Sequence, residues 1–195
     1  MATSEPSDRA ADAAMERYAA GDDTAFAELY DHVAPRLYAY LLRRTRERER
    51  AEDLAQQTLL HMHRARGRFI PGASVLPWMY AIAHRLLIDT VRRDGRIVLA
   101  PGDQGEEPVA VCPEGQADEQ VYAAQLARRV DDELSRLPES HRVAWEMVRQ
   151  EGLSMAQAAE ALGTTVAAVK LRAHRAYQAL RAVLGDGVQE APDVH

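Results

Sequence analysis

The chain has 195 residues, of which 47% are hydrophobic and 28% are charged, and its formal net charge is −6 at pH 7. This length and composition are sufficient for one ordinary domain or two small ones with hydrophobic cores, and they exclude a short peptide or a disordered tail. A single cysteine, Cys112, excludes an internal disulfide framework, and because no apolar N-terminal segment or 18-residue apolar run occurs, we expect a cytoplasmic protein with no membrane insertion.

The negative charge is distributed unevenly along the chain. Residues 21–100 hold 13 arginines against 10 acidic residues, residues 121–185 hold 9 basic against 7 acidic residues, and residues 101–120 hold 6 acidic residues and no basic one. Two mildly basic blocks separated by an acidic stretch are typical of binding domains joined by a linker. The alternative is coding bias, since Lys170 is the only lysine among the 24 basic residues.

Helical periodicity begins at Met15, after the small and polar residues 1–14. Apolar residues then recur at helical spacing as far as Leu41, which predicts one buried helix face. The acidic and hydroxyl groups of residues 22–24 are suited to a helix start, and Pro35 predicts a boundary or a kink.

Two more helices are expected in this first block. The first runs from Thr45 to Arg66 and carries its apolar residues on one side. Turn-forming residues between Phe69 and Ser74 interrupt the pattern, and a further helix is expected from Val75 to Arg93. The first block is therefore a predicted helical bundle.

A stretch without periodicity, rich in glycine, proline and acidic residues, follows at 95–118 and predicts a flexible linker. Helical spacing resumes at Glu119 and ends at Pro138, and shorter helices are predicted at about 139–150, 154–162 and 166–184. No strand pattern occurs, so we expect an all-α fold with two small helical domains, at residues 15–96 and 120–184, joined by a linker at 97–119.

The spacing of residues 153–180 predicts a helix-turn-helix. Ser154 and Thr165 are placed to cap its two helices, and Gly163 permits the left-handed conformation of the turn. We also expect small Ala159 to let the helices approach, Leu162 to fill the core, and Val166 and Val169 to face inward. The remaining face of the second helix forms a cationic stripe suited to DNA, consisting of Lys170, Arg172, His174, Arg175 and Arg181. The alternative is a solvated helix of a bundle.

A second group combines aromatic residues with arginines in residues 78–93 and the preceding Phe69. Aromatic rings beside arginines are able to stack on unpaired bases and hold their backbone. We expect Trp78 to lie in the core. A DNA-facing surface is expected for Arg85, Arg92, Arg93 and Arg96.

Several motifs, in order and at their spacing, resemble the extracytoplasmic-function sigma factors, the group 4 subfamily of the sigma-70 family. They are EDLAQQTL at residues 52–59, WMYAIAHRLLIDTVRR at 78–93, LPE at 137–139 and VKLRAHRA at 169–176. The resemblance covers about residues 15–94 and 120–184. It implies a non-enzymatic factor that binds core RNA polymerase and directs promoter recognition and transcription initiation.

The resemblance also implies a division of labour among the residues. Residues 15–96 look like the domain that binds the −10 element, residues 120–184 look like the domain that binds the −35 element, and the loop at 69–74 looks like the segment that captures a flipped base. Expected −10 contacts are Phe69, Ser74, Tyr80, Arg85, Arg92, Arg93 and Arg96. Expected −35 contacts are Thr165, Lys170, Leu171, Arg172, His174 and Arg175. Expected polymerase contacts are Glu52, Asp53, Gln56 and Gln57.

Partners beyond polymerase and promoter DNA are also implied. Factors of this kind are often held inactive by an anti-sigma factor, so such a partner is expected. We expect no cofactor and no metal, because His61 and His63 point to different faces of a helix. The alternative from another class is a helix-turn-helix regulator that binds duplex DNA as a dimer without polymerase, which would leave residues 52–59 and 78–93 without a task.

Overall fold

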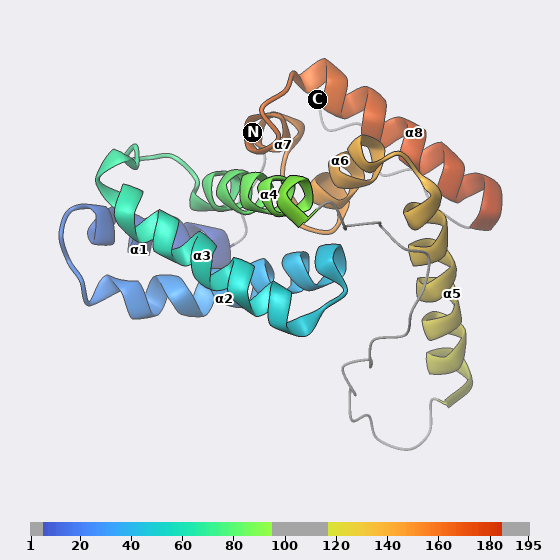
Figure 1. Cartoon of the computed structure of the whole chain (residues 1–195), viewed down its shortest axis with the longest axis horizontal. Coiled ribbons are helices and arrows are strands. Elements are labelled where there is room, and N and C mark those ends of the chain that lie inside the picture. Colours follow the sequence, from blue (N-terminus) through green and yellow to red (C-terminus); the bar gives the residue numbers. More distant parts are fainter. Residues whose placement is uncertain (1–5, 95–116, 185–195) are drawn as a thin grey trace.

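The computed structural model describes residues 6–94 and 117–184, and both stretches are built from helices (Figure 1). The helices are α1 (Pro6–Ala19), α2 (Ala25–Thr45), α3 (Arg48–Ala65), α4 (Val75–Asp94), α5 (Ala117–Arg136), α6 (Glu139–Arg149), α7 (Met155–Ala161) and α8 (Val166–Leu184), with a short 3₁₀ turn, η1, at Arg66–Arg68. These residues contain no strand, which confirms the all-α prediction for the described part of the chain. None of these helices has the length and apolarity needed to cross a membrane.

Helices α1 to α4 form the N-terminal bundle. The buried side of α2 is an apolar stripe at intervals of four, Leu29, Val33, Leu37 and Leu41. It packs between α1 and α3, and α4 closes the bundle with its own buried residues. Burial of each large aliphatic side chain stabilises the fold by about 1.5–3 kcal/mol, so the stripes hold the bundle together.

The first helix begins earlier than the sequence indicates. Residues 6–19 form α1, with Ala11 and Ala14 buried beside Met15. Alanine carries little hydrophobic signal, which explains why the periodicity was visible only from Met15. Two carboxylates of α1 organise the next segments: Asp12 accepts from the Val75 amide at 2.7 Å, and Glu16 accepts from the Gly72 amide at 2.6 Å.

The helix start expected at residues 22–24 is confirmed, because a turn there separates α1 from α2. The Asp22 carboxylate accepts from the Thr24 amide at 3.1 Å, so Asp22 and not Thr24 supplies the side-chain hydrogen bond at the start of α2. Of the boundary or kink expected at Pro35, the boundary is wrong, because α2 continues through this residue to Thr45. Arg46 takes a left-handed conformation (φ 53°), which ends α2 and delays the next helix to Arg48.

Helices α5 to α8 form the C-terminal domain. α6 and α7 pack against α8, and α5 contacts α8 and extends away from the other helices (Figure 1). α5 begins at Ala117, so most of the expected linker at 97–119 lies outside the described residues, as do Arg96 and Cys112.

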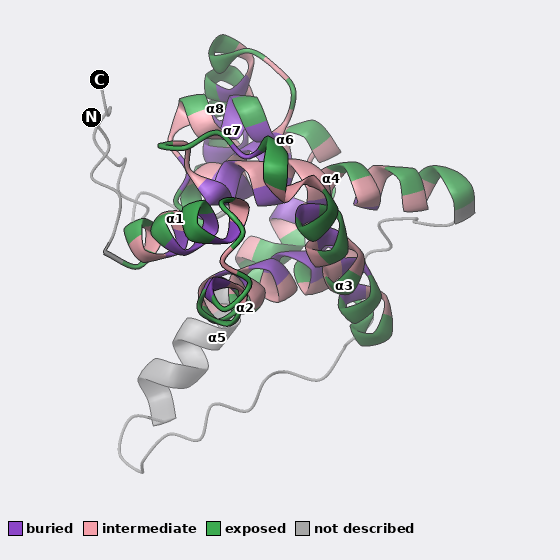
Figure 2. Ribbon diagram, turned by 90° about the vertical axis from the view of Figure 1, so that its left-hand side faces the viewer, coloured by how far each residue is buried: buried purple, intermediate pink, exposed green. Residues whose placement is uncertain are grey.

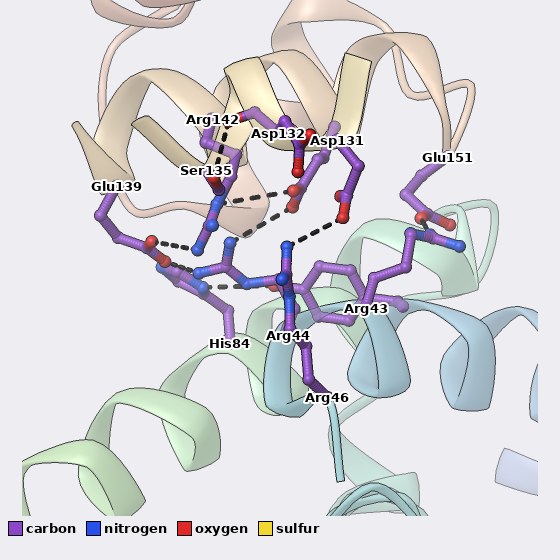
Figure 3. A network of polar contacts seen from close by, with 12 residues as sticks. Arg43, Arg44, Arg46, His84, Asp131, Asp132, Ser135, Glu139, Arg142 and Glu151 are labelled. Carbon is purple, nitrogen blue, oxygen red and sulfur yellow. Dashed lines mark hydrogen bonds and ion pairs between the residues drawn. The ribbon is translucent and has the colours of Figure 1, made fainter. Parts of the chain in front are cut away.

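The two domains are in direct contact, because α7 packs along α4 (Figures 1 and 2). Their buried side chains belong to one continuous cluster that runs from the N-terminal bundle into α6, α7 and α8. Beside this apolar contact lies a polar one, which we call the interdomain ion-pair network (Figure 3). Its members are Arg43, Arg44, Tyr80, Glu139, Arg142, Glu146 and Glu151.

His84 on α4 lies next to this network. Its Nδ1 is 3.4 Å from the Tyr40 hydroxyl, and burial, together with the nearby Arg44 guanidinium, lowers the His84 pKa from 6.5 to about 4. The ring is therefore neutral in the folded protein at pH 5, whereas in the unfolded chain it is protonated.

We therefore predict that His84 makes the protein sensitive to acid. Between pH 6.5 and pH 4 the unfolded chain binds one more proton at this ring, so stability falls as the pH is lowered, by up to about 1 kcal/mol per pH unit. Thermal unfolding of the wild type and of His84→Gln at pH 7 and pH 5 measures this effect. The wild type should lose more stability on acidification than the variant, while the opposing contribution of Glu146, whose pKa burial raises, cancels between the two proteins. Equal losses would contradict the assignment.

Candidate nucleic-acid interface

The turn between α7 and α8 has the local chemistry of a helix-turn-helix. Ser154 caps α7 through a capping box, in which its hydroxyl accepts from the Gln157 amide and the Gln157 side chain accepts from the Ser154 amide. Gly163 has φ +59°, the left-handed region that disfavours other residues. The Thr165 hydroxyl accepts from the Ala168 amide at 3.2 Å. The predicted caps and glycine turn are confirmed.

The inner side of α8 is made of small and apolar residues. Val169 is fully buried, and Ala159 of α7 is 5% exposed, as the close approach of the two helices requires. Leu162 is half-buried and packs against the core. The prediction for Val166 is wrong, because this side chain is 48% exposed at the start of α8 and faces the same solvent as the cationic residues.

The outer side of α8 presents the residues expected to contact the −35 element. Thr165, Lys170, Leu171, His174 and Arg175 are exposed, and Arg172 is half-buried. His174 and Gln178 form a hydrogen bond of 2.9 Å along this face. Exposed apolar side chains beside cations suit a major groove, where a thymine methyl group and phosphate oxygens are both in reach. Exposed Val166 and Leu171 therefore add apolar contact to a cationic surface.

The residues expected to contact the −10 element fall into two groups. Arg85, Arg92 and Arg93 are exposed on α4, and Ser74 is half-buried in the loop that precedes it. Phe69 and Tyr80 are buried instead. The structure thus presents a cationic edge of α4 to solvent and keeps both aromatic rings inside.

Each buried aromatic ring has a specific contact. The Phe69 ring lies 5.6 Å from the ring of Trp78, which is half-buried against the core, in agreement with the core position expected for this tryptophan. The Tyr80 hydroxyl donates to the Glu151 carboxylate, and burial raises its pKa. In this arrangement of the domains Tyr80 is out of reach of DNA.

The loop at residues 69–74 contains an exposed apolar residue that sequence reasoning did not single out. Ile70 is 71% exposed at the tip of this loop. Two hydrogen bonds fix the conformation of the loop. The Gly72 amide donates to the Glu16 carboxylate of α1, and the Ala73 amide donates to the Ile70 carbonyl at 3.0 Å. The available signal in the sequence was a large apolar residue, Ile70, directly before Pro71 in a segment of turn-forming residues.

A cleft separates the cationic edge of α4 from α7. Its α4 wall includes Ile82, Arg85 and Arg92, and its α7 wall includes Glu160 and Leu162. A carboxylate therefore lies across the cleft from two of the expected −10 contacts. Because like charges repel, the acidic α7 wall is unfavourable for a DNA backbone placed here.

The residues expected to contact polymerase lie on the outer side of α3. Glu52, Asp53 and Gln56 are exposed, and the Gln57 amide donates to the Asp53 carboxylate at 2.7 Å. The first three line a groove between α2 and α3. Residues of α2 form its other wall: Tyr30, Asp31, Ala34, Pro35 and Tyr38.

Exposed apolar residues accompany this acidic face. Tyr30 is 47% exposed and Leu60 is 43% exposed, and neither was identified from the sequence. Large apolar side chains surrounded by charged ones are typical of protein interfaces, where a few such anchors supply most of the binding energy. Tyr30 lines the groove together with the acidic and amide residues and Arg48, whereas Leu60 lies in a neighbouring hollow beside Gln56.

The two histidines considered for a metal have different surroundings: His61 lines the cleft beside α4, and His63 contacts α1 and η1. His63 Nδ1 contacts the Tyr18 hydroxyl and lies 3.1 Å from an Arg66 guanidinium nitrogen. The Arg66 guanidinium also sits 4.9 Å above the Tyr18 ring. His63 is therefore part of a packed cluster between α1, α3 and η1.

Comparison with known proteins agrees with this geometry. The family described as Sigma-70 region 2 matches residues 29–97, and the family described as Sigma-70, region 4 matches residues 127–180. The "RNA polymerase sigma factor CarQ" of Myxococcus xanthus is 34% identical over 173 residues, which cover 88% of this chain and 96% of that protein. The "ECF RNA polymerase sigma factor SigK" of Mycobacterium tuberculosis strain H37Rv is 29% identical over 178 residues, 87% of this chain and 91% of that protein.

Solved structures show the same fold. The structure of CnrH in complex with the cytosolic domain of CnrY has a TM-score of 0.65 at 22% identity, over 90% of this chain and 97% of that chain. The sigma factor RpoE from Bartonella quintana, solved with the anti-sigma factor NepR, has a TM-score of 0.62 at 25% identity, over 84% of this chain and 98% of that chain. The chain belongs to the sigma-70 family of RNA polymerase sigma factors, in its extracytoplasmic-function subfamily.

Proposed function

We propose that this sigma factor reads the −35 element with the outer face of α8 and the −10 element with α4 and the loop at 69–74. The observation that carries this assignment is the exposed cationic face of α8, presented by a fully capped helix-turn-helix. The N-terminal domain at 15–96, extended by the start of α1, and the C-terminal domain at 120–184 would each hold one promoter element, with residues 97–119 between them.

The α3 surface is the proposed site for core polymerase. Its carboxylates and amides suit a basic partner surface, and Tyr30 and Leu60 supply apolar anchors. The factor would add no reaction of its own and would act in the cytoplasm, where polymerase and promoter DNA meet. A dimeric regulator that works without polymerase is not favoured, because the match to region 2 covers residues 29–97, for which such a regulator has no use.

An anti-sigma factor is a further proposed partner. One of the similar structures is a complex of a sigma factor with its anti-sigma factor. The groove between α2 and α3 and the cleft between α4 and α7 are hollowed surfaces that such a protein would cover.

Run-off transcription tests the function directly. Core polymerase is incubated with a library of promoter-like duplexes, with and without the chain. We expect transcripts that depend on the chain, and their start sites should reveal both promoter elements. Tight duplex binding by the chain alone, without transcripts, would instead favour the dimeric regulator.

We predict that Arg175→Ala weakens recognition of the −35 element. Loss of a bidentate base contact costs about 1–3 kcal/mol on the cognate sequence, whereas loss of a phosphate contact weakens all sequences alike. Holoenzyme affinity is measured on duplexes with intact and mutated −35 elements. Arg149→Ala, which removes an exposed arginine at the end of α6, is the matched control and should leave both affinities unchanged. A uniform loss for Arg175→Ala would show that this residue does not read bases.

We predict that Asp53→Arg impairs binding of core polymerase while the fold stays intact. The substitution reverses an exposed charge in the α3 groove, and like charges across an interface cost several kcal/mol. Affinity for core enzyme should fall at least about tenfold in a fluorescence titration. Arg149→Glu, an exposed charge reversal at the end of α6, serves as the control. Unchanged affinity of Asp53→Arg would contradict the assignment of this face.

A further inference from the structure

The interdomain ion-pair network joins the end of α2 to α6 and the turn after it (Figure 3). Arg44 pairs with Glu139 and, at 3.4 Å, with Glu146. Arg43 pairs with Glu151, which also accepts from the Tyr80 hydroxyl. A more exposed pair, Arg46 with Asp131 of α5 at 2.8 Å, lies at the edge of the network.

The centre of the network is closed to water. The Arg44 side chain is 1% exposed, and those of Glu146 and Glu151 are 8% and 5% exposed. The attraction within a buried ion pair offsets the free energy of desolvation only when the geometry is good. Loss of one partner leaves the other charge buried and unpaired, which is strongly destabilising. Three arginines, including Arg142, face three glutamates here, so the charges balance only when the two domains meet in this register.

The closed arrangement conflicts with the proposed contacts to DNA. The Tyr80 hydroxyl is engaged by Glu151, and Glu160 of α7 lies across the cleft from Arg85 and Arg92. α7 therefore lies over the part of α4 that has to approach the −10 element.

The spacing of the promoter elements adds a geometric conflict. Elements about 25 base pairs apart are separated by about 85 Å along a duplex that rises about 3.4 Å per base pair. In the structure only α7 separates α8 from α4, and packed helices lie about 8–10 Å apart.

We infer that the interdomain ion-pair network is an autoinhibitory latch, which holds the free factor closed and has to break before polymerase and promoter are engaged. This inference rests on the proposed function. Only open molecules bind polymerase, so the apparent affinity equals the affinity of the open form multiplied by the fraction of molecules that are open. A weaker latch increases this fraction and therefore raises the apparent affinity.

The experiment uses the full chain with two spin labels. Cys112→Ser removes the native thiol, and Arg64→Cys on α3 and Arg149→Cys at the end of α6 place labels on exposed positions of the two domains, away from the DNA-facing side of α8. Pulsed electron–electron double resonance then measures the distance between the labels in the free factor and in the complex with core polymerase and promoter. Affinity for core polymerase is measured in parallel on unlabelled chains.

Two variants open the latch and one serves as control. Arg43→Gln removes an interdomain pair, and Asp131→Asn weakens the exposed pair with little risk to folding. Arg17→Gln breaks an exposed ion pair with Glu28 inside the N-terminal bundle, comparable in exposure to the pair of Arg46 with Asp131. We expect a short, narrow distance in the free wild type and a long one in the complex. Arg43→Gln should lengthen the free distance and raise the affinity for core polymerase at least about threefold, Asp131→Asn should act in the same direction, and Arg17→Gln should change neither.

Three results would overturn the latch. They are a free wild type that is already extended, variants that open without a gain in affinity, and variants that lose transcription at saturating concentration while their circular dichroism stays native. The proposed function is judged separately, because it fails only if the wild type directs no transcripts at saturation.

Discussion

The buried guanidinium of Arg44 is the point on which the arrangement of the two domains depends. It stands at the end of α2, and within the described residues its ion pairs are with Glu139 and Glu146 of α6, in the other domain. Desolvation lowers the Arg44 pKa, and within the described part of the chain its Nε makes no hydrogen bond. A buried ion pair of this kind adds little net stability, but any domain arrangement that leaves the Arg44 guanidinium buried without a carboxylate is strongly destabilised. The apolar contact of α4 with α7 holds the two domains together, and the ion pairs of Arg44 determine how the domains are aligned.

The same constraint explains where the acidic residues lie. Glu139, Glu146 and Glu151 face inward to the other domain, whereas the outer faces of α4 and α8 present arginines. The negative net charge of the whole chain is therefore no measure of the potential that DNA meets at these faces. Separation of the domains would also expose the inner carboxylates, so the charge pattern of the open factor differs from that of the closed one.

Local rules made most of the fold and part of the site predictable from the sequence. Caps at Ser154 and Thr165 and the glycine turn follow from short-range chemistry, and α8 was predicted with its exact bounds. Misses have physical causes. The start of α1 is hidden because alanine gives a weak signal, and Val166 belongs to the first turn, where the helix has not yet reached the core. The burial of Tyr80 and the partners of Arg43 and Arg44 depend on residues about 70 to 110 positions away, which no periodicity encodes.

The hydrogen bonds from α1 to the loop at 69–74 have a consequence for how family members differ. Asp12 and Glu16 fix the Val75 and Gly72 amides, although both lie before residue 29, where the match to region 2 begins. The order of this loop is thus set partly by residues that lie outside the match to region 2. If the loop receives an unstacked base, as proposed, two factors with identical loops but different first helices would differ in how quickly the loop closes around melted DNA.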